Sequence, residues 1–295
     1  MTGTEPQEPG DPAPAGSLWW WALATIVVVG VLLLVVQPWS PHETEPVLPT
    51  SAAPATTPAP TASSDLPSAS PTPSPSPTPP PVPGADAVFD DTTQKQLFVR
   101  PKDLVAAVPA AKDGVDVQIR SGELPWGLPE GSTVNPARCT TAVTVVPTPP
   151  DGFDARGWGN DAMQYVQTIT RLPDAAAAQA AFRDLVVTLD GCPEYEQVNP
   201  GIDGASWTAE PAIEGQGVYP SVVVQLLHSA EGQRTPQYEG HLLVGNVIVT
   251  WTASATGAGP DEDLDVPGEL ATLGTPESLS QLAQDRAQQA VAALG

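Results

Sequence analysis

The strongest constraint on this chain is a continuous apolar segment near its N-terminus. Residues 18–36 carry no charge and consist mostly of Leu, Val, Ile and Ala. At about 1.5 Å per helical residue, this length matches a hydrocarbon core of ~30 Å. Tryptophans at positions 19–21 and 39 lie where indole rings favour the headgroup region, and Pro38 ends the helix. We therefore expect residues 17–38 to form one transmembrane helix that anchors the chain in a cell membrane.

A cleaved secretory signal is the alternative to a retained anchor. Such a signal has a basic N-terminal region, a shorter apolar stretch and a small-residue cleavage site. No Lys or Arg precedes Lys95, the apolar run is longer, and it is followed by Gln37 and Pro38. No cysteine near the run offers a site for a lipid anchor. The pattern favours an uncleaved helix.

Charge bias does not set the orientation, because neither flank of the apolar run carries Lys or Arg. The chain's two cysteines and a long Pro/Ser/Thr tract follow the helix, and both features are more usual outside the cytoplasm. We expect residues 1–16 to be a short cytoplasmic tail. The large C-terminal part is then extracytoplasmic.

A proline-rich tract separates the anchor from the rest of the chain. Fifteen prolines lie between Pro41 and Pro83, with Ser, Thr and Ala in most gaps. Proline fixes φ and disfavours helix in the residue before it, so this stretch favours extended polyproline II over a packed core. We expect a disordered linker at 39–90 and a folded domain at 91–295.

The charge of the domain limits its partners. Of the 34 acidic residues, seven lie at or before Asp86, which leaves 27 acidic against 11 basic side chains beyond it. Such a surface repels phosphate backbones, so nucleic acid and anionic lipid surfaces are poor partners. The preferred explanation for the acidity is that it keeps an exposed domain soluble. A cation, a basic peptide or an uncharged ligand remains compatible with it.

Periodicity in the C-terminal part indicates one short helix, two long amphipathic helices and several strands. Helices are expected at 101–108, at 173–190 with Gly191 as a left-handed terminator, and from Pro276 with Thr275 as its cap. Strands are expected at 163–172, 194–198, 205–213, 218–228 and 238–254, the last broken by a turn at Gly245-Asn246. Two long helices against one antiparallel sheet make an α+β domain.

The two cysteines, Cys139 and Cys192, lie 53 residues apart. In an oxidising compartment a crosslink over this span stabilises by up to ~4 kcal/mol on the chain-entropy model. A disulfide is the expected state, and two unrelated buried thiols are the alternative. The spacing is not that of a CxxC redox or metal pair.

No residue pattern requires catalysis, a cofactor or a metal. His228 and His241 lie in strand patterns and are expected at the sheet surface, and Ser206 lacks the second glycine of a nucleophile elbow. The alternating aspartates 261, 263 and 265 resemble the start of a calcium loop, but Val266 stands where that loop needs glycine. A serine hydrolase and a weak cation site are therefore the less favoured alternatives to a non-catalytic domain and a solvated acidic loop.

The tryptophans offer the clearest candidates for binding. Trp207 and Trp251 lie in strand patterns and are expected in the core. Trp126 and Trp158 lie among Gly and Pro, where we expect the indoles to plug the end of the sheet, with the lining of a ligand cleft by Trp126 or Trp158 as the alternative.

Several short motifs together resemble the PknH-like extracellular sensor domain family. They are Ser121-Gly122, Pro136-Ala137-Arg138-Cys139, the strand around residues 164–167, the Ala-rich helix with Phe182 and Leu185 leading into Cys192, and Gly245-Asn246-Val247. This family comprises outer domains of actinobacterial membrane serine/threonine kinases and anchored relatives. The resemblance implies an α+β sandwich with a cleft for an unidentified ligand. Members often carry two disulfides, whereas this chain has two cysteines and no kinase domain.

These patterns together predict a single-pass protein of the cell envelope whose outer domain binds a ligand or a membrane protein partner without catalysis. A structural or scaffolding role without a small-molecule ligand is the alternative.

Overall fold

The computed structural model describes residues 82–201, 203–256 and 264–295. The expected transmembrane helix at 17–38 and most of the expected linker lie outside the described residues. Within the described ranges, no helix combines the length and apolar character needed to cross a bilayer. All the described residues belong to a single compact unit.

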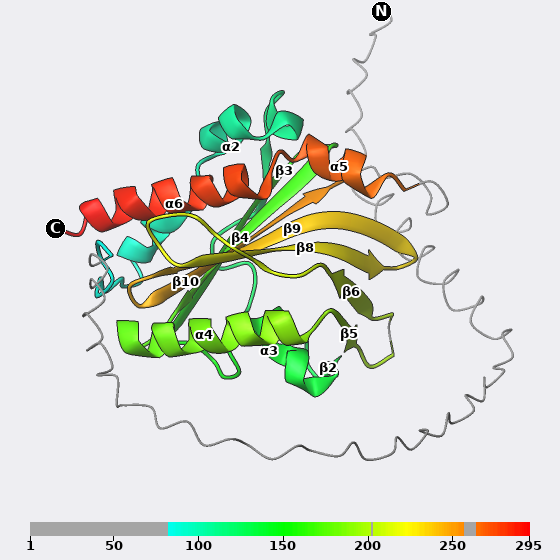
Figure 1. Ribbon diagram of the computed structural model, residues 1–295, viewed down its shortest axis with the longest axis horizontal. Helices are drawn as coiled ribbons and strands as arrows, with labels where there is room; N and C mark the ends of the chain where they lie inside the picture. The colour runs from blue at the N-terminus through cyan, green and yellow to red at the C-terminus, as the bar shows by residue number, and fades with distance from the viewer. Residues whose placement is uncertain (1–81, 202, 257–263) are drawn as a thin grey trace, which may run out of the picture. The chain divides into compact units, whose positions relative to one another are not determined.

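One antiparallel sheet runs through this unit, in the strand order β1-β3-β4-β10-β9-β8-β6-β5-β2, with β7 beside β8. Helices α6, α5 and α2 lie on one side of the sheet, and α4 and α3 lie on the other (Figure 1). The expected α+β class is confirmed. The strands are β1 Asp116–Ile119, β2 Thr133–Asn135, β3 Gly152–Gly159, β4 Met163–Arg171, β5 Glu194–Val198, β6 Ala205–Ala209, β7 Ile213–Glu214, β8 Ser221–Ala230, β9 Gln233–Val244 and β10 Val247–Ala255. The helices are α2 Pro101–Ala107, α3 Thr140–Thr144, α4 Ala175–Gly191, α5 Val266–Thr272 and α6 Pro276–Ala292, with 3-10 turns η1 Thr93–Leu97, η2 Pro109–Ala111 and η3 Ala137–Cys139.

Helix α4 forms where the Ala-rich repeat predicts it. The side chain of Asp174 caps its start by accepting a hydrogen bond from the Ala177 N–H at 2.8 Å. The residues at three- and four-residue spacing, Ala178, Phe182 and Leu185 among them, are buried. The expectation for Gly191 was wrong, because Gly191 is the last helical residue and its φ is not positive.

Helix α6 begins at Pro276 with a capping box. The Thr275 hydroxyl accepts from the Ser278 N–H, and the Ser278 hydroxyl accepts from the Thr275 N–H. This satisfies two backbone donors at the helix start. One face of α6, including Leu279 and Ala283, is buried.

Two shorter helices depart from the expectation. In α2 Leu104 is buried, but Val105, expected on the same face, is exposed. Helix α5 was not predicted at all. Its N-cap is Asp265, whose side chain accepts from the Gly268 N–H, so this aspartate has a structural role. The other two aspartates of the calcium-like pattern, 261 and 263, lie outside the described residues.

The turn between β9 and β10 fastens the start of the domain. Gly245 has a positive φ of 55°, as the first position of a two-residue hairpin turn requires. The side chain of Asn246 is buried. Its Oδ1 accepts from the Phe89 N–H at 2.8 Å, and its Nδ2 donates to the carbonyls of Phe89 and Leu172. Phe89 lies in the core, so the folded unit begins before the expected boundary at residue 90.

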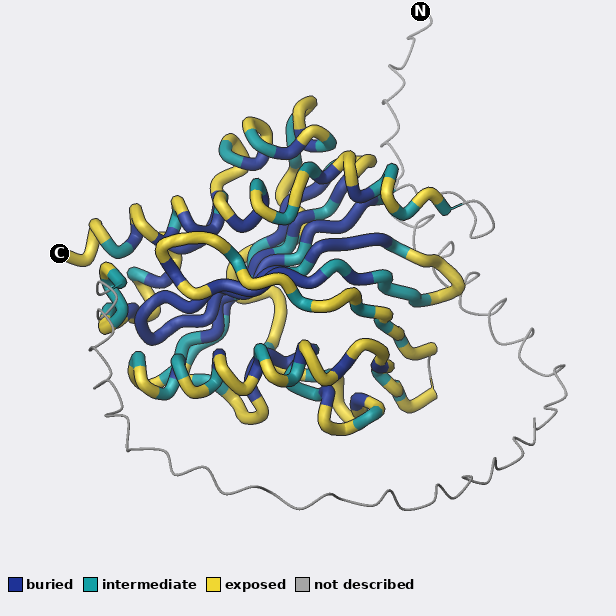
Figure 2. Tube along the Cα trace, viewed as in Figure 1, coloured by how far each residue is buried: buried dark blue, intermediate teal, exposed yellow. Residues whose placement is uncertain are grey.

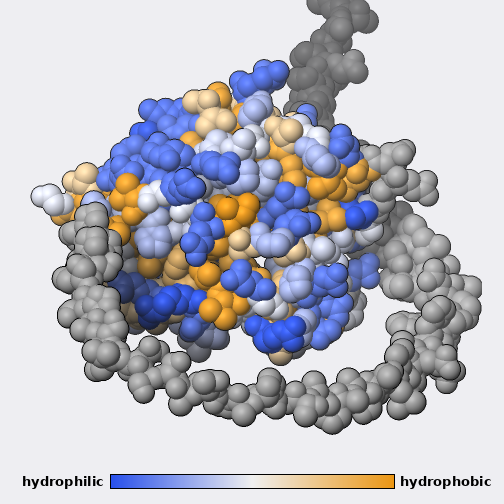
Figure 3. Space-filling model, in the orientation of Figure 1, coloured by the Kyte–Doolittle hydropathy of each residue, from blue (hydrophilic) through white to orange (hydrophobic). Residues whose placement is uncertain are grey.

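The sheet separates two hydrophobic cores. The α6-side core contains Tyr165, Trp251 and Leu242, and the α4-side core contains Phe182, Leu185 and the two cysteines. Buried residues are concentrated along the central strands, and the outward turns of the helices are exposed (Figure 2). On the face seen in Figure 3, hydrophobic side chains gather between α4 and α6, and hydrophilic residues cover much of the remainder.

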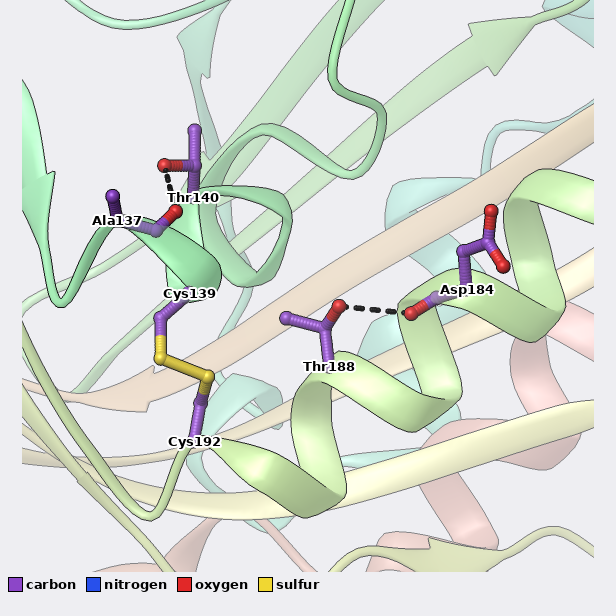
Figure 4. The surroundings of a disulfide bond; sticks show 6 residues. All are labelled: Ala137, Cys139, Thr140, Asp184, Thr188 and Cys192. Carbon is purple, nitrogen blue, oxygen red and sulfur yellow. Dashed lines mark hydrogen bonds between the residues drawn. A yellow bond between two sulfur atoms is a disulfide. The ribbon is translucent and has the colours of Figure 1, made fainter.

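The disulfide between Cys139 and Cys192 is present. It joins the turn before α3 to the residue that follows α4 (Figure 4). Both sulfurs are buried, and the nearby hydroxyls of Thr140 and Thr188 donate to the backbone carbonyls of Ala137 and Asp184. The predicted crosslink is confirmed, and it fixes α3 against α4.

Candidate functional site

A cleft of about 340 Å³ opens on the α4 side of the sheet. Its lining comes from the loop that contains Trp126, from α3, and from strands on both sides of the sheet centre. The cleft therefore depends on segments that are far apart in sequence, and the disulfide holds one of them, α3, in place.

The floor of the cleft is polar. Thr250 and Thr252 of β10 face Thr168 of β4 and Glu239 of β9, and all four line the cavity. Thr250 pairs with Thr168, and Thr252 pairs with Glu239. Because side chains alternate along a strand, these residues point to the same face of the sheet.

This polar floor continues a sheet face that is apolar beneath α4. Leu243 and Ile248 pack in the α4-side core, and two residues further along the same strands stand His241 and Thr250. The opposite face of β10 stays apolar along its whole length, through Trp251 and Ala253. The change from apolar to polar occurs only on the cleft side. A concave surface with a few polar groups among apolar walls is the usual composition of a ligand site.

One wall of the cleft is a row of aromatic rings across three strands. Tyr195 of β5, Trp207 of β6 and His228 of β8 are direct cross-strand neighbours. The ring centroids of Tyr195 and Trp207 are 5.2 Å apart, and those of Trp207 and His228 are 5.1 Å apart. Trp207 is only half-buried, which corrects its expected place in the core.

Trp126 closes the cleft from the loop between β1 and β2. Its indole Nε1 donates to the carbonyl of Thr144 at 3.1 Å, which fastens the loop to the end of α3. The next residue, Val145, lines the cleft with a positive φ of 67°. That backbone conformation is strained for a β-branched residue, and such strain is concentrated at functional sites.

Charge in the cleft is limited to one carboxylate. Burial raises the pKa of Tyr195, and the neighbouring Glu239 carboxylate raises it further, so the phenol stays neutral. Burial lowers the pKa of His228 below 6.5. Glu239 is the one carboxylate among the lining residues.

His241 lies directly behind this carboxylate. Its Nδ1 is 2.9 Å from the Thr250 hydroxyl, and its Nε2 is 3.1 Å from the Glu239 carboxylate without the alignment of a hydrogen bond. The imidazole is completely buried. The expected position at the sheet surface was wrong for His241, while His228 is partly exposed in the cleft wall.

The arrangement does not favour a serine hydrolase. Trp207 pairs with His228, so Ser206, its neighbour in β6, points to the other face of the sheet. Among the described residues there is also no group of three or more His, Cys, Asp or Glu side chains placed to hold a metal.

The two tryptophans named as candidate cleft residues lie at separate sites. Trp126 lines the cleft just described, whereas Trp158 is a residue of β3 and lines a second pocket on the α6 side. Trp158 is 4% exposed and packs near Tyr165, with ring centroids 6.2 Å apart. Its place in a strand was missed because the surrounding glycines indicate a loop.

No local sequence pattern marks Tyr195 or Glu239 as a cleft residue. A usable signal exists in β9, where the polar residues Gln237, Glu239 and His241 alternate with Tyr238 and Leu242. Both faces of that strand are buried from Pro236 onward. A polar face on such a strand indicates that these side chains have a role besides packing in a hydrophobic core.

Comparison with known proteins gives a resemblance among solved structures. No protein-family model and no curated protein matches the chain. The extracellular domain of PknH from Mycobacterium tuberculosis is similar at 13% identity and a TM-score of 0.49, over 68% of this chain and 96% of that chain. An uncharacterized protein of Mycobacterium smegmatis (Rv0999 ortholog) is similar at 16% identity and a TM-score of 0.30, over 61% of this chain and 85% of that chain. The PknH-like resemblance noted in the sequence is thus found again among the structure neighbours.

Proposed function

We propose that this domain is a non-catalytic, sensor-like binding module, held outside the cytoplasm by an N-terminal membrane anchor. It binds an uncharged ring rich in hydroxyl groups, of which a sugar unit is the representative class. The single observation that carries this proposal is the polar floor of the cleft, set against a wall of stacked aromatic rings.

The two surfaces match the two sides of such a ring. Trp207 and His228, which stay partly exposed in the aromatic row, supply apolar contact area for the apolar side of such a ring. The hydroxyls of Thr168 and Thr252 and the carboxylate of Glu239 supply donors and acceptors for hydroxyl groups. With one carboxylate and no basic residue in the lining, the cleft disfavours an anionic ligand.

The extracytoplasmic location is supported by the disulfide, since such crosslinks persist mainly in oxidising compartments. The apolar run at residues 18–36 supports the anchor.

The test is thermal unfolding of the full chain in a detergent without a sugar headgroup, titrated with soluble oligosaccharides of cell-envelope glycans. Saturable stabilisation is expected, reaching about 2.7 kcal/mol at a hundredfold excess over Kd. Trp207→Leu and Glu239→Gln should each weaken binding by about tenfold or more. Glu210→Gln, which makes the same charge change on an exposed residue between β6 and β7, is the matched control.

Two outcomes contradict the proposal. Stabilisation that is the same in wild type and both cleft variants would place the ligand elsewhere on the chain. The lack of stabilisation by any oligosaccharide would favour the alternative, a scaffold protein of the cell envelope.

A further inference from the structure

The second pocket is lined by several basic residues, although the chain as a whole is strongly acidic. This cavity of about 440 Å³ lies on the α6 side, between the β1–β3 edge, the segment around Phe98 and helix α6. No carboxylate lines it. Its lining includes five of the 11 basic residues of a chain with net charge −23, namely Lys95, Arg100, Arg120, Arg156 and Arg286.

Existing contacts leave most of this charge unneutralised. Arg156 has its guanidinium carbon 4.6 Å from the centroid of the Phe98 ring. Neither Arg156 nor Lys95 has an acidic partner within salt-bridge distance among the described residues. Arg286 donates to the backbone carbonyls of Phe98 and Gln96, which are neutral groups.

The acidic groups nearby are already engaged. Asp103 pairs with Arg100 at 2.7 Å and Glu123 pairs with Arg120 at 3.5 Å, both at the rim. Asp154 accepts from the Ser121 hydroxyl and the Gly122 N–H. Burial and the nearby charge of Arg100 lower the pKa of Arg286, as expected where positive charges are close together.

Apolar side chains complete the pocket. Val117 is 51% exposed at its edge, and Ile119 and Trp158 form a wall beside Arg156. Val117 and Trp158 are a cross-strand pair, so the wall is part of the sheet and is rigidly placed. Planar guanidinium groups bind phosphate in a bidentate manner, and an apolar wall next to them favours an organic group on that phosphate.

We infer that the pocket between β1, β3 and α6 is a binding site for a small organic phosphate, with the phosphate held by Arg156 and its basic neighbours and the organic group against Trp158 and Ile119. This site is separate from the cleft. It favours an anionic ligand, which the cleft disfavours. The acidic surface elsewhere on the domain disfavours docking to an anionic bilayer, so a free phosphate is the expected source.

Phenyl phosphate is the probe, with inorganic phosphate, phenol and benzylamine as comparisons. Titration calorimetry on the full chain should give saturable binding of phenyl phosphate, weaker binding of inorganic phosphate, and no binding of phenol or benzylamine. Affinity should fall as salt rises, because the contact is ionic. Arg156→Gln should weaken phenyl phosphate binding by about tenfold or more.

Arg183→Gln is the matched control, because Arg183 lies exposed on α4, on the other side of the sheet, and its loss changes the net charge equally. Lys95→Gln, at an exposed position, guards against misfolding in Arg156→Gln and should also weaken binding. Equal affinity in Arg156→Gln, Lys95→Gln and Arg183→Gln would overturn the inference, as would equal binding of benzylamine.

A competition experiment with lipid vesicles distinguishes a lipid headgroup from a soluble phosphate as the ligand. Phosphatidylglycerol vesicles that compete with phenyl phosphate, while phosphatidylcholine vesicles do not, would assign the site to a lipid headgroup. Phenyl phosphate binding without this competition assigns it to a soluble phosphate. Oligosaccharide binding in the cleft should be unchanged in Arg156→Gln. A negative result for phosphate binding in the pocket is therefore distinguishable from a negative result for oligosaccharide binding in the cleft.

Discussion

At the residue scale, burial decides the charge of the cleft wall. His228 lies in the aromatic row beside Trp207, where desolvation lowers the pKa of its imidazole. In the unfolded chain the imidazole has its ordinary pKa of about 6.5. Below that pH the unfolded chain binds the proton first, so this residue makes unfolding easier as the pH falls.

We expect His228→Gln to reduce the pH dependence of stability. The wild type should lose stability between about pH 7 and the lowered pKa of the folded state, and the variant should lose less over that range. Urea unfolding at closely spaced pH values measures both slopes. The same slope in both proteins would show that the imidazole does not titrate as its burial implies.

Some cleft residues could be predicted from the sequence and others could not. Trp126 was recognised as a cleft candidate because an indole among glycines and prolines lies outside the strand patterns that place Trp207 and Trp251 in the core. Thr168, Thr250 and Glu239 were not, because their exposure depends on which part of the sheet face α4 covers. The position of α4 on the sheet is a property of the tertiary structure, and no local sequence pattern predicts it.

At the element scale, periodic segments were predictable and irregular ones were not. Strand β4 and helices α4 and α6 carry apolar residues at the spacing of one buried face, so their type followed from the sequence. Strand β3 contains three glycines and lacks an alternating pattern. It is a strand because it pairs with β4, the next strand along the chain, and with the more distant β1, and neither pairing can be read from the sequence of β3 itself.

The pairing of β9 with β10 depends on a glycine opposite a tryptophan. Gly240 faces Trp251, and a Cβ at Gly240 would lie 2.3 Å from the indole ring. We expect Gly240→Ala to destabilise the domain by about 1–3 kcal/mol, because the fully buried Trp251 has no room to move. Chemical unfolding followed by Trp fluorescence measures the loss.

Gly191→Ala is the control for this substitution. A Cβ at Gly191 has no atom within 4 Å, and the residue is helical. Its replacement should leave stability unchanged or raise it by up to about 1 kcal/mol. An equal loss in both variants would mean that the close packing of Trp251 is not the cause.

At the scale of the whole molecule, the disulfide joins the sequence-distant halves of the α4 side. It links the start of α3 to the end of α4, and α3 contributes Ala142 and Val143 to the cleft. Fold class and crosslink were predictable because composition and spacing determine them. The separation of Trp126 and Trp158 into two sites was not, because it depends on the complete strand order.

Replacing both cysteines by alanine should lower the free energy of unfolding by up to ~4 kcal/mol on the chain-entropy model. The reason is the freedom that the unfolded chain gains over 53 residues. Thermal unfolding of the double variant, compared with oxidised and reduced wild type, checks this. Unchanged stability in the double variant and in reduced wild type would contradict a stabilising role.

The hydrogen bonds of the buried Asn246 side chain have a mechanical consequence. Asn246 forms hydrogen bonds with the backbone of Phe89, near the start of the folded unit, and its hairpin joins the two strands that carry Glu239 and Thr250. Force applied from the N-terminal side therefore reaches this hairpin, which forms the base of the cavity, as well as α6, where Gly84 lies against Val291. In a tethered protein, tension and occupancy would act on the same pair of strands.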